Sequence, residues 1–373
     1  MFLESLENNG VASNVQGLWI QSGTHAYAAH RESAPLAAAS VTKIATSLTA
    51  LQQLGPAYRF TTKFGYTGRV VDGTLRGDLV VAGGDDPFFV WEHAFEVANL
   101  VESLGIKQVS GSLIIQAPFA MNFESEGQLA GELLRQALSS SLWSEAAIAQ
   151  FSTLPSETPR PNIQVLGDIQ IVSKLPGNTT WLVQHQSLPL IELLKRMNRY
   201  SNNPMADQIA SYLGGADHVT QVVQTLTGLG SEEVKFINGS GLGTENQITP
   251  QGAALMIQAL AKFLESEGMS LGDVMTIVGV DEGILDPRPL PTGLVAKSGT
   301  LDQVSALAGV LPTQTEGPIW FSMFNTQGDV VSFRRAQEAL LGEMVNRWGM
   351  VEAEATLAPT LNPAQLQTIT RPL

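Results

Sequence analysis

The chain has 373 residues, with 35 acidic and 21 basic side chains, a formal net charge of −14 and no cysteine. Its 44% hydrophobic and 15% charged residues indicate a folded protein of two or three domains, or one domain with a large insertion. The acidic balance argues against nucleic acid and against an anionic membrane as the main ligand, because both need a basic surface. Without cysteine, the chain has no disulfide, thiolate nucleophile or cysteine-bound metal.

No apolar run reaches the roughly 20 residues that span a membrane as a helix. The first eleven residues, MFLESLENNGV, contain two glutamates and no lysine or arginine, which is unlike a signal peptide. Two interpretations stay open at this point: a cytoplasmic protein, or a chain whose leader has been removed.

In the first part of the chain, residues 15–22 are predicted to form a strand that turns at Gly23 into a second strand. Residues 41–54 are predicted to form a helix, because apolar side chains recur there every three or four positions. Gly55-Pro56 ends this helix, and Ser40 is expected at its N-cap or in its first turn.

From about residue 60 to residue 172 the pattern changes to short β-like runs and turns, interrupted by two helical patterns near 92–104 and 128–142. The β-like runs lie at 61–66, 79–82, 112–115 and 163–172. We therefore predict a mostly β domain at 63–174, inserted into a domain built from 1–62 and 175–373. The proline-rich piece 154–161 is its most linker-like segment.

From residue 180 the first pattern returns, with a predicted strand at 181–184 and helices at 188–197 and from Met205. Two β-like runs at 305–311 and 318–324 precede a last helix at 333–348. The tail after Gly349 is rich in alanine, threonine and proline, and we expect it to lie loosely on the surface.

Three short motifs follow one another along the chain, and each occurs once: Ser40-Val-Thr-Lys43, Ser201-Asn-Asn203 and Lys297-Ser-Gly299. A single S-x-x-K is a weak signal, but S-x-x-K, S-x-N and K-[ST]-G in this order are a strong one. Their predicted settings also agree with one site, since they fall at a helix start, in a loop beside a helix and on a strand.

The residue types suit acyl transfer through a serine nucleophile. Ser40 and Lys43 lie one turn apart on one helix face, so Lys43 can take the hydroxyl proton if burial and a second cation, Lys297, lower its pKa. Ser201 would relay a proton to the leaving amine, and Asn203 would hold Lys43 and the substrate amide. The backbone N–H groups of Ser40 and Thr300 would form the oxyanion hole.

This set of motifs resembles the class C low-molecular-mass penicillin-binding proteins, the serine-type D-alanyl-D-alanine carboxypeptidases and endopeptidases. Further segments carry the resemblance over most of the chain, apart from a gap around 120–180. They are PLAAASVTK (35–43), GDLVVAGGDDP (77–87), GIKQVSGSLII (105–115), HQSLPLIELLKRM (185–197), NGSGLG (238–243) and AKSGTL (296–301).

The resemblance implies an α/β fold, a β-lactamase/transpeptidase-like domain in which helices flank an antiparallel sheet. It implies a carboxypeptidase that acts on peptidoglycan stem peptides through a Ser40 acyl-enzyme and is inhibited by β-lactams, with no metal, cofactor or nucleic acid. Lys297 and Ser298 would bind the terminal carboxylate, with Gly299 and Thr300 beside them. The place of action would be periplasmic or otherwise extracytoplasmic, with peripheral association with the cell envelope, and the leader removed or unrecognisable.

The chain departs from the family pattern at several positions. Asn202 replaces the usual aspartate of S-x-N, and serine replaces threonine in K-T-G. Gln116 stands where many members carry an aspartate that recognises the stem peptide, which makes it a candidate substrate-binding residue and leaves the preferred stem open. The interval from Lys43 to Ser201, 201 − 43 = 158 residues, is shorter than usual, so one inserted subdomain is expected to be missing or reduced.

Several alternatives stay open. Tyr200-Ser-Asn202 also reads as the Y-x-N of class C β-lactamases and related esterases, although Ala206-Asp207 favours the S-x-N register. Asp85-Asp86 suits a turn better than a metal site, and the five histidines show no metal-binding spacing. A β-lactamase or esterase on the same fold, or a binding homologue without activity, are the other functions to be tested, and the sequence does not separate carboxypeptidase from endopeptidase.

Overall fold

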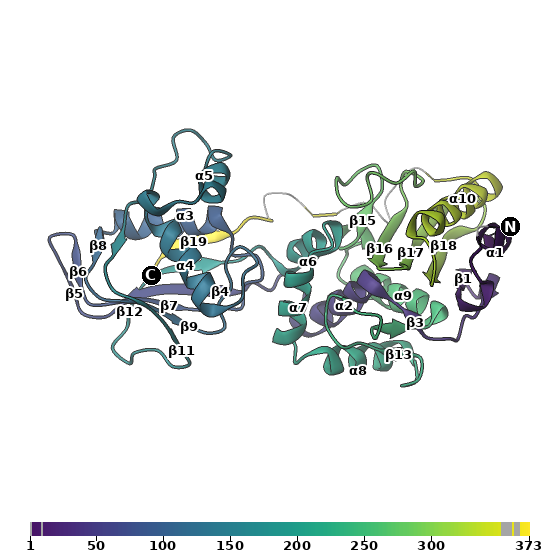
Figure 1. Ribbon diagram of the computed structural model, residues 1–373, viewed down its shortest axis with the longest axis horizontal. Coiled ribbons are helices and arrows are strands. Elements are labelled where there is room, and N and C mark those ends of the chain that lie inside the picture. The colour runs from purple at the N-terminus through teal and green to yellow at the C-terminus, as the bar shows by residue number, and fades with distance from the viewer. Residues whose placement is uncertain (1, 9, 352–359, 362–365) are drawn as a thin grey trace. The chain divides into compact units, whose positions relative to one another are not determined.

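The computed structural model of the protein describes residues 2–8, 10–351, 360–361 and 366–373. The chain forms two compact units (Figure 1). The first unit comprises Met1–Ala57 and Leu190–Asn362, and the second comprises Tyr58–Pro189 and Pro363–Leu373. These divisions differ from the predicted ones, which placed the insertion at 63–174 and left the whole tail in the first part.

The first unit is built around a six-stranded antiparallel sheet in the order β15-β16-β17-β18-β1-β2. A small three-stranded sheet has the order β13-β14-β3. The strands are β1 (Gly17–Ser22), β2 (His25–His30), β3 (Leu36–Ala37), β13 (Val234–Lys235), β14 (Gln247–Ile248), β15 (Thr276–Ile277), β16 (Val295–Leu301), β17 (Val304–Thr313) and β18 (Gly317–Thr326). The predicted strand pair near residue 23 and the two late β-like runs are confirmed.

Helices cover the sheet of the first unit, with α10 on one face and α2 and α9 on the other (Figure 1). The α-helices are α1 (Phe2–Asn8), α2 (Thr42–Leu54), α6 (Leu190–Arg199), α7 (Asn203–Tyr212), α8 (Ala216–Thr227), α9 (Pro250–Ser266) and α10 (Val330–Trp348). Short 3₁₀ turns are η1 (Ser13–Val15), η2 (Ala39–Val41) and η4 (Leu271–Asp273). An antiparallel sheet between helices is the architecture that the resemblance implies.

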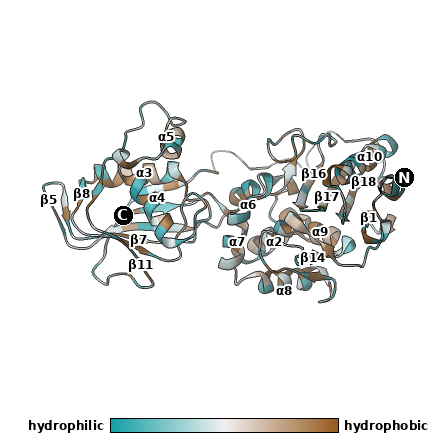
Figure 2. Ribbon diagram, in the orientation of Figure 1, coloured by the Kyte–Doolittle hydropathy of each residue, from teal (hydrophilic) through white to brown (hydrophobic). Residues whose placement is uncertain are grey.

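Helix α2 lies in the interior of the first unit. Every residue from Thr42 to Leu51 is buried, including Lys43 at 0% exposure. Figure 2 shows the hydrophobic colouring that marks α2 and α9. A helix that is buried on all sides needs other elements around it, and α6, α7, α8 and α9 all contact α2.

Two glycines hold the chain just before α2 in place. A Cβ added to Gly241, whose φ is +83°, would lie 1.8 Å from the carbonyl oxygen of Ala39. A Cβ on Gly299 of β16 would lie 2.8 Å from both the Cβ of Ala39 and the backbone nitrogen of Ser40. Ala39 itself has a φ of +44°, which a non-glycine residue rarely adopts. The backbone at residues 39–40 is therefore fixed between two segments that approach it closely only because they lack side chains.

The second unit contains two sheets, of order β11-β9-β7-β4-β12-β19 and β10-β8-β6-β5. Its strands are β4 (Thr61–Tyr66), β5 (Arg69–Val71), β6 (Thr74–Arg76), β7 (Leu79–Ala82), β8 (Gln108–Val109), β9 (Leu113–Gln116), β10 (Gln164–Val165), β11 (Ile169–Val172), β12 (Thr180–Gln186) and β19 (Ile369–Pro372). Strands β7, β9 and β11 are parallel, and the other neighbours in the larger sheet are antiparallel. The predicted run at 163–172 forms two strands in different sheets, separated where Gly167 packs on the backbone of Gly111.

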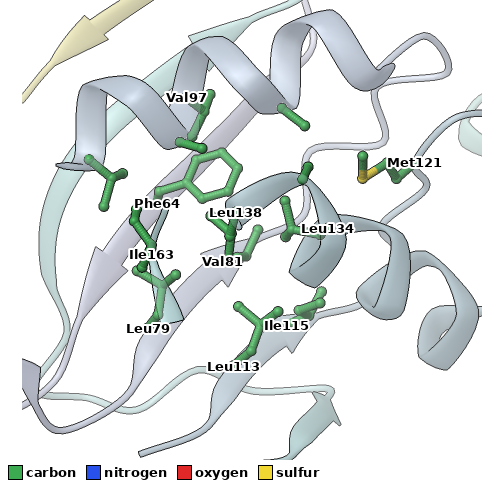
Figure 3. Close-up of a cluster of buried hydrophobic side chains, with 14 of the residues drawn as sticks. Phe64, Leu79, Val81, Val97, Leu113, Ile115, Met121, Leu134, Leu138 and Ile163 are labelled. Atoms are coloured by element: carbon green, nitrogen blue, oxygen red, sulfur yellow. The ribbon is translucent and has the colours of Figure 1, made fainter. Parts of the chain in front are cut away.

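Helices α3 (Trp91–Ser103), α4 (Gly127–Leu138) and α5 (Glu145–Phe151), with the turn η3 (Ser140–Leu142), complete the second unit. Helices α3 and α4 pack against the larger sheet. Figure 3 shows the core between them, where Phe64, Leu79, Val81, Leu113 and Ile115 from the strands meet Val97, Leu134 and Leu138 from the helices. This core belongs to the second unit alone, so the insertion has its own hydrophobic centre.

The boundary differences have a physical reason in strand pairing. Strand β12, which the sequence analysis assigned to the first part, pairs with β4 along its whole length, so residues 180–186 belong to the second unit. Strand β19 pairs with β12 on its other side. The prediction of a loose tail is therefore wrong for residues 369–372, and Thr360 also binds the Asp273 carboxylate through its N–H and hydroxyl. The rest of the tail, at 352–359 and 362–365, lies outside the described residues.

Replacing Leu134 by alanine should lower the free energy of unfolding of the second unit by about 2–5 kcal/mol, because the fully buried side chain would leave a cavity. Leu129→Ala on the same helix is the matched control: its side chain is 54% exposed, so the expected change is within about 0.5 kcal/mol. Urea denaturation followed by tryptophan fluorescence measures both. Equal losses in the two variants would contradict the described core.

Gly241→Ala should destabilise the first unit more than Gly228→Ala. Both glycines have positive φ, so both variants carry about 1–2 kcal/mol of backbone strain. Only at Gly241 would the new methyl group also clash with the Ala39 carbonyl, because nothing lies within 4 Å of the Cβ position at Gly228. Denaturation midpoints measure the difference, and an equal effect of the two substitutions would show that residues 39–40 are not fixed in this way.

Candidate active site

Ser40 lies in the 3₁₀ turn η2 directly before α2, where the sequence places it. The first turn of a helix has unpaired N–H groups and favours negative charge nearby. Ser40 is half-buried, while Ala38 and Ala39 before it are fully buried. The Ser40 hydroxyl therefore lies at the boundary between the buried core and the surface, on a backbone segment that its neighbours hold in place.

Lys43 follows one turn later and points its ammonium group at three oxygen atoms. Its Nζ lies 3.0 Å from Ser40 Oγ, 2.7 Å from Asn203 Oδ1 and 2.7 Å from the carbonyl oxygen of Ser240. Burial lowers the pKa of Lys43 to about 7, although the nearby Asp207 carboxylate acts in the opposite direction. Near neutral pH, a substantial fraction of Lys43 is therefore an uncharged amine.

The three contacts determine which proton a neutral Lys43 accepts. An uncharged amine has two N–H bonds and one lone pair. The Asn203 Oδ1 and the Ser240 carbonyl oxygen carry no proton, so the amine donates to both of them. The third partner, the Ser40 hydroxyl, is the one that has a proton to give. The lone pair of Lys43 is thereby directed at Ser40, which is the arrangement of a general base and its nucleophile.

The Ser201-Asn-Asn203 segment forms the junction between α6 and α7. Helix α6 ends in a Schellman motif, in which the Asn202 N–H donates to the Met197 carbonyl and Ser201 takes a left-handed φ of +52°. Asn202 then caps α7, because its Oδ1 accepts from the Met205 N–H at 2.9 Å. Asn202 therefore serves both the end of α6 and the start of α7, and the side chains of Ser201 and Asn203 are available to bind Lys297 and Lys43.

The contacts favour the S-x-N register. Ser201 Oγ accepts from Lys297 Nζ at 2.9 Å, and Asn203 accepts from Lys43. In the alternative Y-x-N register the working residues would be Tyr200 and Asn202, but Tyr200 is 53% exposed and Asn202 is occupied as a helix cap.

Lys297 lies on β16 and is buried to 1% exposure, with its Nζ on Ser201 Oγ and on the Ser298 carbonyl oxygen. Burial lowers its pKa well below the ordinary value, and the charge of Lys43 lowers it further. The repulsion is mutual, so protonation of one lysine disfavours protonation of the other. The sequence analysis expected both burial and Lys297 to lower the pKa of Lys43, and burial is the largest cause.

Strand β16 passes beside Ser40 with its outer edge open. Strand β15 pairs with β16 only at Val295 and Ala296, so residues 297–301 have a strand neighbour on one side, β17. Gly299 allows this strand to touch Ser40 N, and Ser298 is 8% exposed. An open strand edge next to a nucleophile can bind an extended peptide by main-chain hydrogen bonds.

The sequence analysis missed two contributors to the site. The loop of residues 238–243 carries part of the resemblance, but the sequence did not predict that the Ser240 carbonyl binds Lys43. Asp207 holds this loop, because its Oδ1 accepts from the Ser240 N–H at 2.8 Å. The glycine density of NGSGLG was the available signal, since Gly239 and Gly241 both lie against backbone oxygen atoms.

Gln116 ends β9 in the second unit, where its Nε2 lies 3.3 Å from the Ser173 carbonyl oxygen. Its role toward a substrate stays a prediction. In the neighbouring turn, Asp86 Oδ1 accepts from the Phe88 N–H at 2.9 Å, a local bond typical of a turn. Among the described residues, no three histidine, aspartate or glutamate side chains gather as a metal-binding group would.

The family called "D-Ala-D-Ala carboxypeptidase 3 (S13) family" matches residues 4–128 and 116–344 of the chain. Carboxypeptidase Rv3627c of Mycobacterium tuberculosis is 26% identical over 354 residues, which cover 82% of this chain and 74% of that protein. D-alanyl-D-alanine carboxypeptidase DacB of Haemophilus influenzae and carboxypeptidase DacB of Mycolicibacterium smegmatis are each 28% identical. Those two matches cover 46% and 41% of this chain, and about a third of each relative, 36% and 37%.

Solved structures have the same fold. The Bd0816 predatory endopeptidase of Bdellovibrio bacteriovorus, in complex with immunity protein Bd3460, superposes with a TM-score of 0.75 at 23% identity and covers 91% of this chain and 96% of that one. Penicillin-binding protein 4 (dacB) of H. influenzae superposes with a TM-score of 0.70 at 17% identity, over 92% of this chain and 99% of that one. These likenesses confirm the transpeptidase-like α/β fold.

The matched family covers both units and includes the segments that carry Ser40, Lys43, Ser201, Asn203 and Lys297. The resemblance found in the sequence is thereby confirmed, and the chain belongs to the D-Ala-D-Ala carboxypeptidase 3 (S13) family of serine-type carboxypeptidases.

Proposed function

We propose that the protein is a serine-type D-alanyl-D-alanine carboxypeptidase that acts on peptidoglycan stem peptides through an acyl-enzyme on Ser40. The single observation that carries this proposal is the buried Lys43, whose lone pair is directed at the Ser40 hydroxyl by two acceptors that have no proton to give. Membership of the family supplies the substrate class.

The proposed reaction begins when neutral Lys43 takes the Ser40 proton and the Ser40 oxygen attacks the carbonyl carbon of the penultimate D-alanine. The backbone N–H groups of Ser40 and Thr300 stabilise the oxygen that becomes negative. The C–N bond then breaks: Ser201 passes its proton to the nitrogen of the leaving D-alanine and regains one from the lysine pair, which leaves Lys43 neutral again. Lys43 next takes a proton from a water molecule whose oxygen attacks the ester carbon, the bond to the Ser40 oxygen breaks, and Ser40 takes that proton back as the shortened peptide leaves.

Lys297 and Ser298 take the terminal carboxylate of the peptide in this proposal, and Asn203 orients Lys43 and the substrate amide. A carboxylate beside Lys297 would raise the pKa of that lysine, because an opposite charge favours the ammonium form. Mutual repulsion would then keep Lys43 neutral. Binding of a substrate with a terminal carboxylate would therefore favour the neutral form of Lys43, which is the form that can take the Ser40 proton.

β-Lactams present a strained amide and a carboxylate to the same groups, so we propose that they acylate Ser40. Cross-linked stem peptides contain the same acyl donor with a different leaving amine, so assays should include both a pentapeptide and a cross-linked dimer.

Peptidoglycan lies outside the cytoplasmic membrane, and we propose extracytoplasmic action, periplasmic or peripheral to the cell envelope. No helix in the described part of the chain is long and apolar enough to cross a membrane.

Intact-protein mass spectrometry after incubation with benzylpenicillin tests the acyl-enzyme. The wild-type protein should gain one penicilloyl group that maps to Ser40, and Ser40→Ala should gain none. Slow loss of the group indicates a penicillin-binding protein, and fast loss indicates a β-lactamase. Folded wild-type protein that forms no adduct with several β-lactam classes would overturn the proposal and favour a binding homologue.

The rate of acylation should rise with pH through about 7, because the reactive form is the one in which Lys43 has lost its proton. Asp207→Asn should move this midpoint to lower pH, since the Asp207 charge raises the pKa of Lys43 and the amide oxygen can still accept from Ser240. Second-order acylation rates with a fluorescent penicillin between pH 5 and 9 give both profiles. A midpoint that is the same in both proteins would show that Lys43 is not the titrating base.

A further inference from the structure

Arg334 contacts β16, the strand that also carries Lys297. It lies in the second turn of α10, and its Nη2 donates to the exposed Thr300 hydroxyl at 2.9 Å. Thr300 comes directly after Gly299, which touches the backbone of Ser40. A guanidinium group thus stands beside the first exposed hydroxyl of the strand that passes the nucleophile.

The position of Arg334 is fixed by the helix that carries it. Ser305 is the cross-strand partner of Thr300, so their side chains share one face of the sheet. Gln337, one turn after Arg334, donates to the Ser305 carbonyl oxygen at 3.2 Å and is fully buried. Phe333 and Ala336 are buried in the core of the first unit. These contacts anchor α10 over the Thr300–Ser305 pair.

The charge of Arg334 is not neutralised within the described part of the chain. The acidic residue on this face of α10, Glu338, is paired with Arg288, whose Nε lies 2.8 Å from Glu338 Oε1. Arg334 makes no salt bridge to any described residue, and its Nε is buried without a hydrogen-bond partner. A positive charge with unsatisfied donors beside an active site indicates a place for an anion.

The hydrogen bond with Thr300 also prepares the hydroxyl to bind an anion. Because Thr300 Oγ1 accepts from Arg334, its own proton is available to a second acceptor. Donation from a cation polarises the hydroxyl and strengthens that second bond. An oxygen bound to Thr300 would lie within reach of the same guanidinium, whose planar set of donors matches a carboxylate.

We propose that Arg334, together with the Thr300 hydroxyl, binds the terminal carboxylate of the substrate and supplies its positive counter-charge; this inference rests on the proposed carboxypeptidase function. Arg334 would act beside Lys297 and Ser298: its charge is permanent, whereas burial and the neighbouring Lys43 both lower the pKa of Lys297. Arg334 is then a further residue that makes the enzyme specific for a free carboxyl terminus, in addition to Lys297.

The test compares Arg334→Gln with Arg335→Gln, which removes the same charge from the next, exposed position of α10. Each variant and the wild type react with benzylpenicillin and with benzylpenicillin methyl ester, which lacks the carboxylate. Second-order acylation rates are measured by mass spectrometry, with thermal melting as a check on folding. Arg334→Lys, which keeps the charge without the planar fork, is measured beside them.

Arg334→Gln should slow acylation by the acid about ten- to a hundredfold, the range expected for a lost charge-assisted hydrogen bond. Its rate with the methyl ester should stay within about twofold of wild type, Arg334→Lys should recover part of the loss with the acid, and Arg335→Gln should match wild type with both compounds. Equal slowing with acid and ester, or no slowing at all, would overturn the inference while leaving the proposed function intact. Failure of the wild-type protein to react with either compound would instead overturn the proposed function, and this inference with it.

Discussion

The burial of the Lys43 ammonium group is the constraint on which the rest of the first unit depends. A buried amine is tolerated only if hydrogen-bond acceptors surround it, and here they come from three separate parts of the chain: Ser40, Asn203 and the Ser240 carbonyl. Each acceptor needs its own support. The α6–α7 junction presents Asn203, the Asp207 carboxylate holds the loop of Ser240, and Gly241 lets that loop reach Ala39.

The same burial decides the electrostatics of the site. Two lysine side chains are buried close together. Burial lowers the pKa of Lys43, and the nearby Asp207 carboxylate partly offsets this decrease. The pKa of Lys43 thereby lies close to neutrality, where an amine is both available and strong enough to act as the general base that we propose. Strain at Ala39 and Ser201, two non-glycine residues with positive φ, accompanies this arrangement and is held by the packing around it.

The local sequence predicts the site better than it predicts the borders of the units. Ser40 and Lys43 are joined by helical spacing alone, and turn residues indicate Ser201 and Asn203, so short-range rules suffice. Asp207, Ser240 and Arg334 act through contacts between distant segments, which no single-sequence pattern specifies. The sequence did not predict strand β19 for a similar reason. Its four residues, Ile-Thr-Arg-Pro, form a strand only because β12, some 180 positions earlier in the chain, has an edge with which they can pair.

That pairing has a consequence for biosynthesis. Ribosomes make a chain from its N-terminus, so β12 emerges well before β19, with the remainder of the first unit synthesised between them. Throughout this interval the larger sheet of the second unit keeps an exposed edge of backbone donors and acceptors, the kind of surface at which nascent strands mispair or aggregate. Completion of the inserted unit is thus tied to completion of the unit that surrounds it, and a message truncated before codon 369 would yield a protein with an open sheet even where all five motif residues are present.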